Sequence, residues 1–224
     1  MKSKDSGDIK DKSENKVKCK GSIHLIRHGQ TEGNINRLYY GASDIPLTDV
    51  GIFELEENCE RDIYPPAKGA RMFTTGMYRT EQTFAVIYGG QRGFDVKPVE
   101  EPEHDILDGM KEYDFGDYEL KTHDELKDFE EYRSWIGDAS GETCPPGGES
   151  PANFQRRVWK EFESLLESFD GDNIIVICHG GVISTIMTRF FTPNEPNIYK
   201  WQPDPGRGYT LLVENGEVVA YEEI

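Results

Sequence analysis

Two loops of the chain carry side chains that could handle a phosphate group. Residues 27–29, Arg-His-Gly, follow an apolar run at 22–26, and residues 179–181, His-Gly-Gly, follow the run Asn173–Cys178. A neutral imidazole can attack phosphorus, a guanidinium neutralises an anion with a planar fork of donors, and glycine adds backbone freedom. Because short, β-prone apolar runs predict buried strands, both loops are expected at strand ends.

The elements that must position these loops alternate along the chain. Caps and apolar periodicity predict helices from Thr48 to about Cys59, over 78–87, from Ser150 to about Phe169 and over 180–191, with a capping box at Thr122 and Glu125. Weaker patterns predict strands at 71–74 and 96–99, and Asn215-Gly216 predicts a hairpin between 208–213 and 217–221. This alternation favours an α/β sandwich with a mostly parallel sheet, in which ligands bind beyond the carboxyl ends of the strands. His28 and His179 both fall at such ends.

The composition fits one globular domain preceded by a tail. A chain of 224 residues, 36 % of them apolar, is long enough for a single core. Residues 1–20 contain no aromatic side chain and mix Lys with Asp, Glu and Ser, so we expect a flexible tail there and the folded domain over 21–224. No segment is apolar enough to span a bilayer or to act as a secretory signal, which predicts a soluble, cytoplasmic protein.

The net charge of −17 narrows the class of partner. It opposes binding to nucleic acid or to an anionic membrane, and it disfavours small anions unless Arg and His side chains reverse the field locally. The four cysteines lack the paired spacing of zinc sites and disulfide frameworks, so reduced thiols are expected. The partner expected is a small phosphorylated substrate, and the oligomeric state is left open.

Neither histidine loop predicts a metal or a cofactor. His24 and His28 are four residues apart, but on an extended strand such positions lie roughly 13 Å from each other and cannot share an ion. Cys178 precedes His179 and would face the opposite side of its strand, so we expect it in the core and not as a thiol nucleophile.

Five segments, matched in order and spacing, resemble the histidine phosphatase superfamily. The first is Arg27-His28-Gly29-Gln30-Thr31-Glu32 with Asn34, and the others are residues 44–51, 75–83, 110–119 and 176–181. One Arg-His-Gly triplet is weak evidence, whereas five ordered matches are not. The resemblance extends over 21–224 and implies a three-layer α/β/α sandwich of the phosphoglycerate mutase-like type.

The resemblance also implies a role for each matched residue. His28 matches the nucleophile that becomes transiently phosphorylated. Four further residues match the groups that grip the phosphate oxygens, namely Arg27, Asn34, Arg79 and His179. Glu112 matches the general acid, which would protonate the leaving oxygen and then activate water. Its acidic neighbours, Asp108, Asp114, Asp117 and Glu119, would ordinarily be solvated, and only the family pattern singles out Glu112.

The motifs favour a phosphatase over two other functions. Residues 115–119 and 146–150 resemble the small phosphatases, including the α-ribazole phosphatases, more than the glycolytic mutases. The expected substrate is therefore α-ribazole 5′-phosphate or a sugar phosphate. The alternatives are a cofactor-dependent phosphoglycerate mutase and a non-catalytic module that binds phosphorylated partners, which would be expected to lack His28 or Glu112.

Variable loops at 35–46 and 132–149 are expected to set specificity. Their aromatic residues could stack on a ring-shaped substrate or merely pack the loops, and these are Tyr39, Tyr40, Tyr132 and Trp135. One departure from the family pattern lies nearby, since Leu120 stands where glycine is common.

Overall fold

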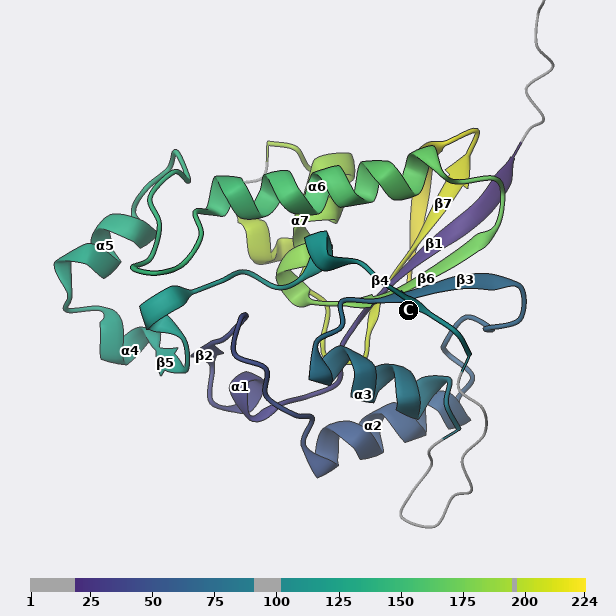
Figure 1. Ribbon diagram of the computed structural model, residues 1–224, viewed down its shortest axis with the longest axis horizontal. Helices are drawn as coiled ribbons and strands as arrows, with labels where there is room; N and C mark the ends of the chain where they lie inside the picture. Colours follow the sequence, from purple (N-terminus) through teal and green to yellow (C-terminus); the bar gives the residue numbers. More distant parts are fainter. Residues whose placement is uncertain (1–18, 91–101, 195–196) are drawn as a thin grey trace, which may run out of the picture.

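A six-stranded sheet forms the middle of the molecule, in the order β4-β3-β6-β1-β7-β8 (Figure 1). The computed structural model describes residues 19–90, 102–194 and 197–224. The neighbours β4, β3, β6 and β1 run parallel, while β7 is antiparallel to both β1 and β8, so the predicted mostly parallel sheet is confirmed. The strands are β1 Lys20–Arg27, β3 Ala70–Thr74, β4 Asp105–Ile106, β6 Asn173–Cys178, β7 Gly208–Glu214 and β8 Glu217–Glu223.

Helices cover both faces of this sheet, which gives the three layers of an α/β/α sandwich (Figure 1). The side chains of β6 alternate between the faces, because successive residues of a strand point to opposite sides. Ile174, Val176 and Cys178 join the core beneath α6 and α7, whereas Ile175 and Ile177 join the core beside α3. The main helices are α2 Asp49–Glu60, α3 Tyr78–Ile87, α6 Pro151–Glu167 and α7 Gly180–Phe191.

The predicted caps and turns mark where these elements begin and end. Thr48 Oγ1 accepts a hydrogen bond from Gly51 N at the start of α2, and Ser150 Oγ accepts one from Asn153 N at the start of α6. Asn215 and Gly216 both have positive φ, 55° and 79°, as the tight turn between β7 and β8 requires. These predicted boundaries are confirmed.

Several short elements that sequence patterns did not predict surround the carboxyl ends of the parallel strands (Figure 1). They are α1 Glu32–Ile35, the small sheet of β2 Leu38–Tyr39 and β5 Lys121–Thr122, α5 Glu130–Ile136, and the 3₁₀ turns η1 Asp108–Met110, η2 Gly116–Tyr118 and η3 Ile198–Trp201. Between β5 and α5 lies α4 His123–Leu126, where both hydrogen bonds of the predicted capping box form. Most of these pieces are too short to show a periodic pattern.

Two further predictions concern the start of the folded domain and a strand at 96–99. β1 begins at Lys20, one residue before the expected domain boundary, and Lys20 Nζ lies 2.6 Å from Glu214 Oε1. The rest of the expected tail, residues 1–18, and the strand predicted at 96–99 lie outside the described residues. Within the described part, none of the helices combines the length and apolarity needed to span a bilayer.

Candidate active site

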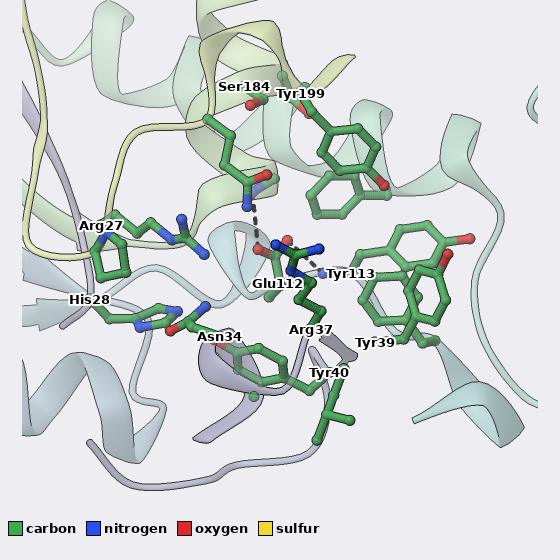
Figure 2. A pocket seen from close by; sticks show the side chains of 18 of the residues that line it. Arg27, His28, Asn34, Arg37, Tyr39, Tyr40, Glu112, Tyr113, Ser184 and Tyr199 are labelled. Atoms are coloured by element: carbon green, nitrogen blue, oxygen red, sulfur yellow. Dashed lines mark hydrogen bonds between the residues drawn. The ribbon is translucent and has the colours of Figure 1, made fainter. Parts of the chain in front are cut away.

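The two histidine loops meet at one edge of the sheet. β1 and β6 are parallel neighbours with Arg27 opposite Cys178, so the residues that follow them, His28 and His179, lie side by side with ring centroids 5.4 Å apart. A pocket of about 810 Å³ opens above His28. Figure 2 shows Arg27, His28 and Asn34 at one end of this pocket, Glu112 in its middle and aromatic side chains at the far end.

The His28 ring is held with one nitrogen free. Its Nδ1 lies 2.7 Å from the Gly29 carbonyl oxygen, which can only accept, so Nδ1 carries the proton and Nε2 is left bare. Gly29 leaves room for the Leu55 side chain, because a Cβ at residue 29 would lie 2.8 Å from Leu55 Cδ1. The imidazole is buried, with 2 % of its residue surface exposed.

The environment of His28 keeps the ring neutral. Burial lowers its pKa well below the ordinary value of 6.5, and the positive charges of Arg79 and Arg27 lower it further. A neutral imidazole with a bare Nε2 is the form that can act as a nucleophile.

Arg27 presents an unsatisfied donor beside this ring. One terminal nitrogen of its guanidinium donates to the Pro203 carbonyl at 2.7 Å, which fixes the side chain against the loop after η3. Its Nε is buried and has no hydrogen-bond partner among the described residues. Because a buried N–H without a partner is unfavourable, this donor fits an anion bound in the site.

Arg79 and His179 lie beneath the pocket and are both fully buried. Arg79 comes from the first turn of α3, and its Nε donates to His179 Nδ1 at 3.3 Å. The terminal nitrogens of Arg79 donate to the carbonyls of Gly41 and Ser43, at 2.8 and 3.0 Å. A further bond runs from Nη1 to Asp44 Oδ1 at 3.4 Å. Four of the five N–H groups of the guanidinium therefore have acceptors in the protein, and one remains for a ligand.

His179 is committed to the protein through both nitrogens. With Nδ1 accepting from Arg79, its Nε2 carries the proton and donates to Thr75 Oγ1 at 2.9 Å. Neither Arg79 nor His179 is among the residues that line the open pocket, whereas Arg27, His28 and Glu112 are. The structure therefore brings all the predicted phosphate contacts together but places these two one layer deeper.

Asn34 is oriented by the start of α1. Its side-chain oxygen accepts hydrogen bonds from Thr31 N and Thr31 Oγ1, at 3.0 and 3.1 Å. The amide nitrogen is the half of the side chain left to donate, and Asn34 lines the pocket next to His28.

Glu112 is the acidic residue of its segment that reaches the pocket around His28. Its carboxylate accepts from Tyr113 N at 2.9 Å and from Gly181 N, in the first turn of α7, at 3.0 Å. Gly181 allows this approach, because a Cβ at that position would clash with the Glu112 carboxylate.

Three of the four competing acids have other partners, and the fourth, Asp117, does not line the pocket. Asp108 pairs with Lys111, Asp114 accepts from Gly116 N, and Glu119 accepts from a set of backbone N–H groups. A second acid that lines the pocket, Asp204, was not singled out by the sequence motifs.

Sequence reasoning missed two carboxylates that support the site. Glu119 accepts from the backbone N–H groups of Gly41, Ala42 and Ser43, at 3.0 to 3.1 Å, in the loop whose carbonyls hold Arg79. Glu149 binds Arg157, whose guanidinium also donates to the Glu112 carbonyl at 2.9 Å. Both carboxylates belong to segments that matched the family pattern. Their partners lie on other segments of the chain, so the sequence alone did not indicate these contacts.

The aromatic residues named as possible stacking groups divide into two sets. Tyr39, Tyr40 and Trp135 line the pocket. Tyr132 does not, because it is fully buried behind Tyr39, and the two hydroxyl oxygens lie 2.7 Å apart. The prediction that Tyr132 could stack on a ligand is therefore wrong. Tyr132 instead packs within the loops and holds the Tyr39 hydroxyl in place.

Among residues 19–90, 102–194 and 197–224, no three side chains of His, Cys, Asp or Glu gather closely enough to hold an ion. His24, which the sequence placed away from His28, has its Nδ1 2.8 Å from Thr210 Oγ1.

Known proteins are similar to this chain over most of its length. The family model described as histidine phosphatase superfamily (branch 1) matches residues 23–221. An adenosylcobalamin/α-ribazole phosphatase of Salmonella typhimurium is 31 % identical over 187 residues, which cover 82 % of this chain and 86 % of that protein. A 2,3-bisphosphoglycerate-dependent phosphoglycerate mutase of Mesorhizobium japonicum is 25 % identical, covering 91 % of this chain and 97 % of the mutase.

Solved structures agree with the sequence relatives. The crystal structure of a putative α-ribazole-5′-P phosphatase from Escherichia coli superposes with a TM-score of 0.73 at 25 % identity, covering 91 % of this chain and 94 % of that one. The chain belongs to the histidine phosphatase superfamily, branch 1. Within that family it is a phosphatase, as the resemblance implied.

Proposed function

We propose that this phosphatase hydrolyses a small phosphate monoester through a phosphohistidine formed on His28. The observation that carries the proposal is the state of the His28 ring, neutral and with Nε2 bare, beside the buried and unpartnered Nε of Arg27. A nucleophile and an unsatisfied cationic donor whose residues line the same pocket suit a group that is both electrophilic and anionic.

In the first step, Nε2 of His28 attacks phosphorus while the ester P–O bond breaks. Arg27, Arg79 and the Asn34 amide hold the non-bridging oxygens, and their charge and hydrogen bonds stabilise the transition state. His179 acts here through Arg79, because its Nδ1 accepts a hydrogen bond from Arg79 Nε. If the hydrogen bond from His179 Nε2 to Thr75 opens, Nε2 can donate to the phosphate instead. Protonated Glu112 gives its proton to the leaving alkoxide, so a neutral alcohol departs.

In the second step, water attacks the phosphohistidine from the side that the alcohol has left. Glu112, now a carboxylate, takes a proton from this water, the P–N bond breaks, and inorganic phosphate and neutral His28 are regenerated. The same carboxyl therefore serves both steps, and the cationic side chains supply the charge neutralisation without a metal.

The substrate proposed is α-ribazole 5′-phosphate or a related sugar phosphate. The Salmonella relative is named as an adenosylcobalamin/α-ribazole phosphatase, and the matched segments span most of both chains. The pocket of about 810 Å³ leaves room for a leaving group much larger than a phosphate. We expect a cytoplasmic enzyme, in keeping with such a substrate.

The test measures inorganic phosphate released, in the presence of chelator, from α-ribazole 5′-phosphate, ribose 5-phosphate and 3-phosphoglycerate. Wild type should hydrolyse at least one of them, and His28→Ala should lose at least about 10³-fold in kcat because the nucleophile is gone. A denaturing quench at alkaline pH, where the P–N bond of a phosphohistidine survives, with substrate labelled in the phosphoryl group should trap label on the wild-type protein and not on His28→Ala.

The matched control is His24→Gln, a change four residues earlier, on the strand that leads to His28, at a residue that does not line the pocket. This variant should keep activity and trapping. Isomerisation of 3-phosphoglycerate without phosphate release would favour a mutase instead. Hydrolysis that survives in His28→Ala would overturn the mechanism.

A further inference from the structure

The end of the pocket beyond Glu112 is walled by aromatic rings (Figure 2). Neighbouring ring centroids in this aromatic wall are separated by 4.6 Å for Tyr113 and Phe115, 5.1 Å for Tyr39 and Phe115, and 5.4 Å for Tyr113 and Phe154. Its members all line the pocket and are Tyr39, Tyr113, Phe115, Trp135 and Phe154. None of this wall takes part in the phosphoryl transfer described above.

The polar atoms of the aromatic wall are used up inside the protein. The Tyr39 hydroxyl bonds to that of Tyr132 at 2.7 Å, and Trp135 Nε1 donates to the Tyr113 hydroxyl at 3.1 Å. The Tyr113 hydroxyl in turn donates to the Glu149 carbonyl. The wall therefore offers the pocket ring surface and no free donor, and its rings are fixed before any ligand arrives.

The α7 side of the pocket carries a polar group without a partner, in contrast to the aromatic wall. Ser184 lines the pocket, has 2 % of its surface exposed, and its hydroxyl oxygen has no hydrogen-bond partner among the described residues. Figure 2 shows Ser184 beside Tyr199, across the pocket from Tyr39. A buried hydroxyl without a partner is unfavourable unless a ligand satisfies it, and one χ1 rotation is enough to re-aim it.

We infer that this end of the pocket is a leaving-group subsite for an alcohol that combines a flat ring with hydroxyl groups, as a ribonucleoside does. The ring stacks on the aromatic wall at Tyr39, and Ser184 bonds a sugar hydroxyl. This inference rests on the proposed function, since it concerns the alcohol that the phosphoryl transfer releases.

The ring is tested with adenosine 5′-monophosphate and ribose 5-phosphate, which share the phosphate and the ribose. Wild type should prefer the nucleotide by at least about tenfold in kcat/KM, the range expected for one stacked base. Tyr39→Leu should remove most of this preference by lowering kcat/KM for the nucleotide alone. The matched variant Tyr39→Phe keeps the ring and should keep the preference.

The hydroxyl is tested with adenosine 5′-monophosphate against its 2′,3′-dideoxy analogue. Ser184→Ala should reduce the wild-type preference for the ribo compound about five- to tenfold, the loss of one hydrogen bond. Thr188→Ala is the matched control, because Thr188 also has a buried, unpartnered hydroxyl on α7 but does not line the pocket.

The outcomes separate the two proposals. Equal hydrolysis of both ring-bearing and ringless substrates, or a preference unchanged in Tyr39→Leu and Ser184→Ala, would overturn the subsite and leave the phosphatase mechanism standing. Absence of hydrolysis from all three substrates and from α-ribazole 5′-phosphate would overturn the proposed function, and the subsite with it.

Discussion

At the scale of single residues, the site depends on side chains that never meet the substrate. The Glu119 carboxylate accepts from the N–H groups of Gly41, Ala42, Ser43 and Phe115. Two carbonyls of the same short loop accept from the terminal nitrogens of Arg79. Glu119 therefore orients Arg79 through one layer of backbone, and its effect on catalysis should appear in the binding of phosphate.

Replacing Glu119 by glutamine keeps the shape of the side chain but turns an N–H group toward other N–H donors. We expect Glu119→Gln to lose about 1–3 kcal/mol of unfolding free energy, measured by urea denaturation, because the backbone N–H groups lose one of the two charged oxygens that accept from them. Inhibition by inorganic phosphate should weaken about tenfold as Arg79 loses its fixed orientation.

The control for this change is Glu125→Gln, in the capping box of α4 and away from Arg79. It should leave phosphate inhibition as in wild type. Unchanged phosphate inhibition in a folded Glu119→Gln protein would show that the loop holds Arg79 without the carboxylate.

At the scale of the element, β1 carries a titratable group in its middle. His24 is buried, which lowers its pKa from 6.5 to about 4. Between these two values the unfolded chain binds a proton that the folded strand does not. The contribution to folding stability is therefore complete above about pH 6.5 and is lost as the pH falls toward about 4.

This linkage predicts how stability depends on pH. The free energy of unfolding of wild type should decrease on acidification from pH 7 to 4, with about 3 kcal/mol of the decrease due to His24, from the shift in its pKa. His28 and His179, whose pKa values are also lowered by burial, add to the same slope. His24→Val removes one titrating group from a β-strand that tolerates Val. Its free energy of unfolding should therefore fall less steeply with decreasing pH, by the uptake of one proton on unfolding.

Denaturation at several pH values gives both curves. The slopes of wild type and His24→Val should differ between pH 4 and 6.5 and coincide above pH 7. Parallel curves over the whole range would mean that the imidazole accepts a proton in the folded strand.

At the scale of the whole molecule, the sequence predicted the long elements and the chemistry better than the pocket. Strands such as β6 are continuous apolar runs, and α6 has a cap, a proline and an apolar face, so local patterns sufficed. The convergence of His28 and His179 followed from the rule that parallel strands present their carboxyl ends together. The motifs themselves named Glu112, which the structure brings into the pocket.

What the sequence did not predict depends on contacts between distant short segments. Tyr39 and Tyr132 are 93 residues apart, and nothing local indicates that one lines the pocket while the other is buried behind it. Leu120, where the family resemblance led us to expect glycine, adopts φ 60°, and its N–H donates to the Tyr39 carbonyl at 2.7 Å. A left-handed backbone favours glycine, which accounts for the glycine expected at position 120. Only the folded structure shows that the chain turns there.

The charge of the whole molecule should oppose the substrate that its site attracts. A net charge of −17 repels a phosphate dianion at long range, whereas Arg27 and Arg79 act over a few ångströms inside the site. Salt shortens the Debye length from about 30 Å at 0.01 M to about 8 Å at 0.15 M, so it screens the distant repulsion much more than the local attraction. We expect kcat/KM to rise about twofold over that range at fixed pH.

A charge variant separates long-range repulsion from other effects of salt. Glu163 and Glu167 lie exposed on α6 and do not line the pocket, and changing both to lysine reduces the net negative charge by four. The double variant should exceed wild type in kcat/KM at 0.01 M salt and should depend less on added salt. A kcat/KM that falls as salt is added to wild type would mean that the field of the arginines extends beyond the pocket and already guides the substrate in.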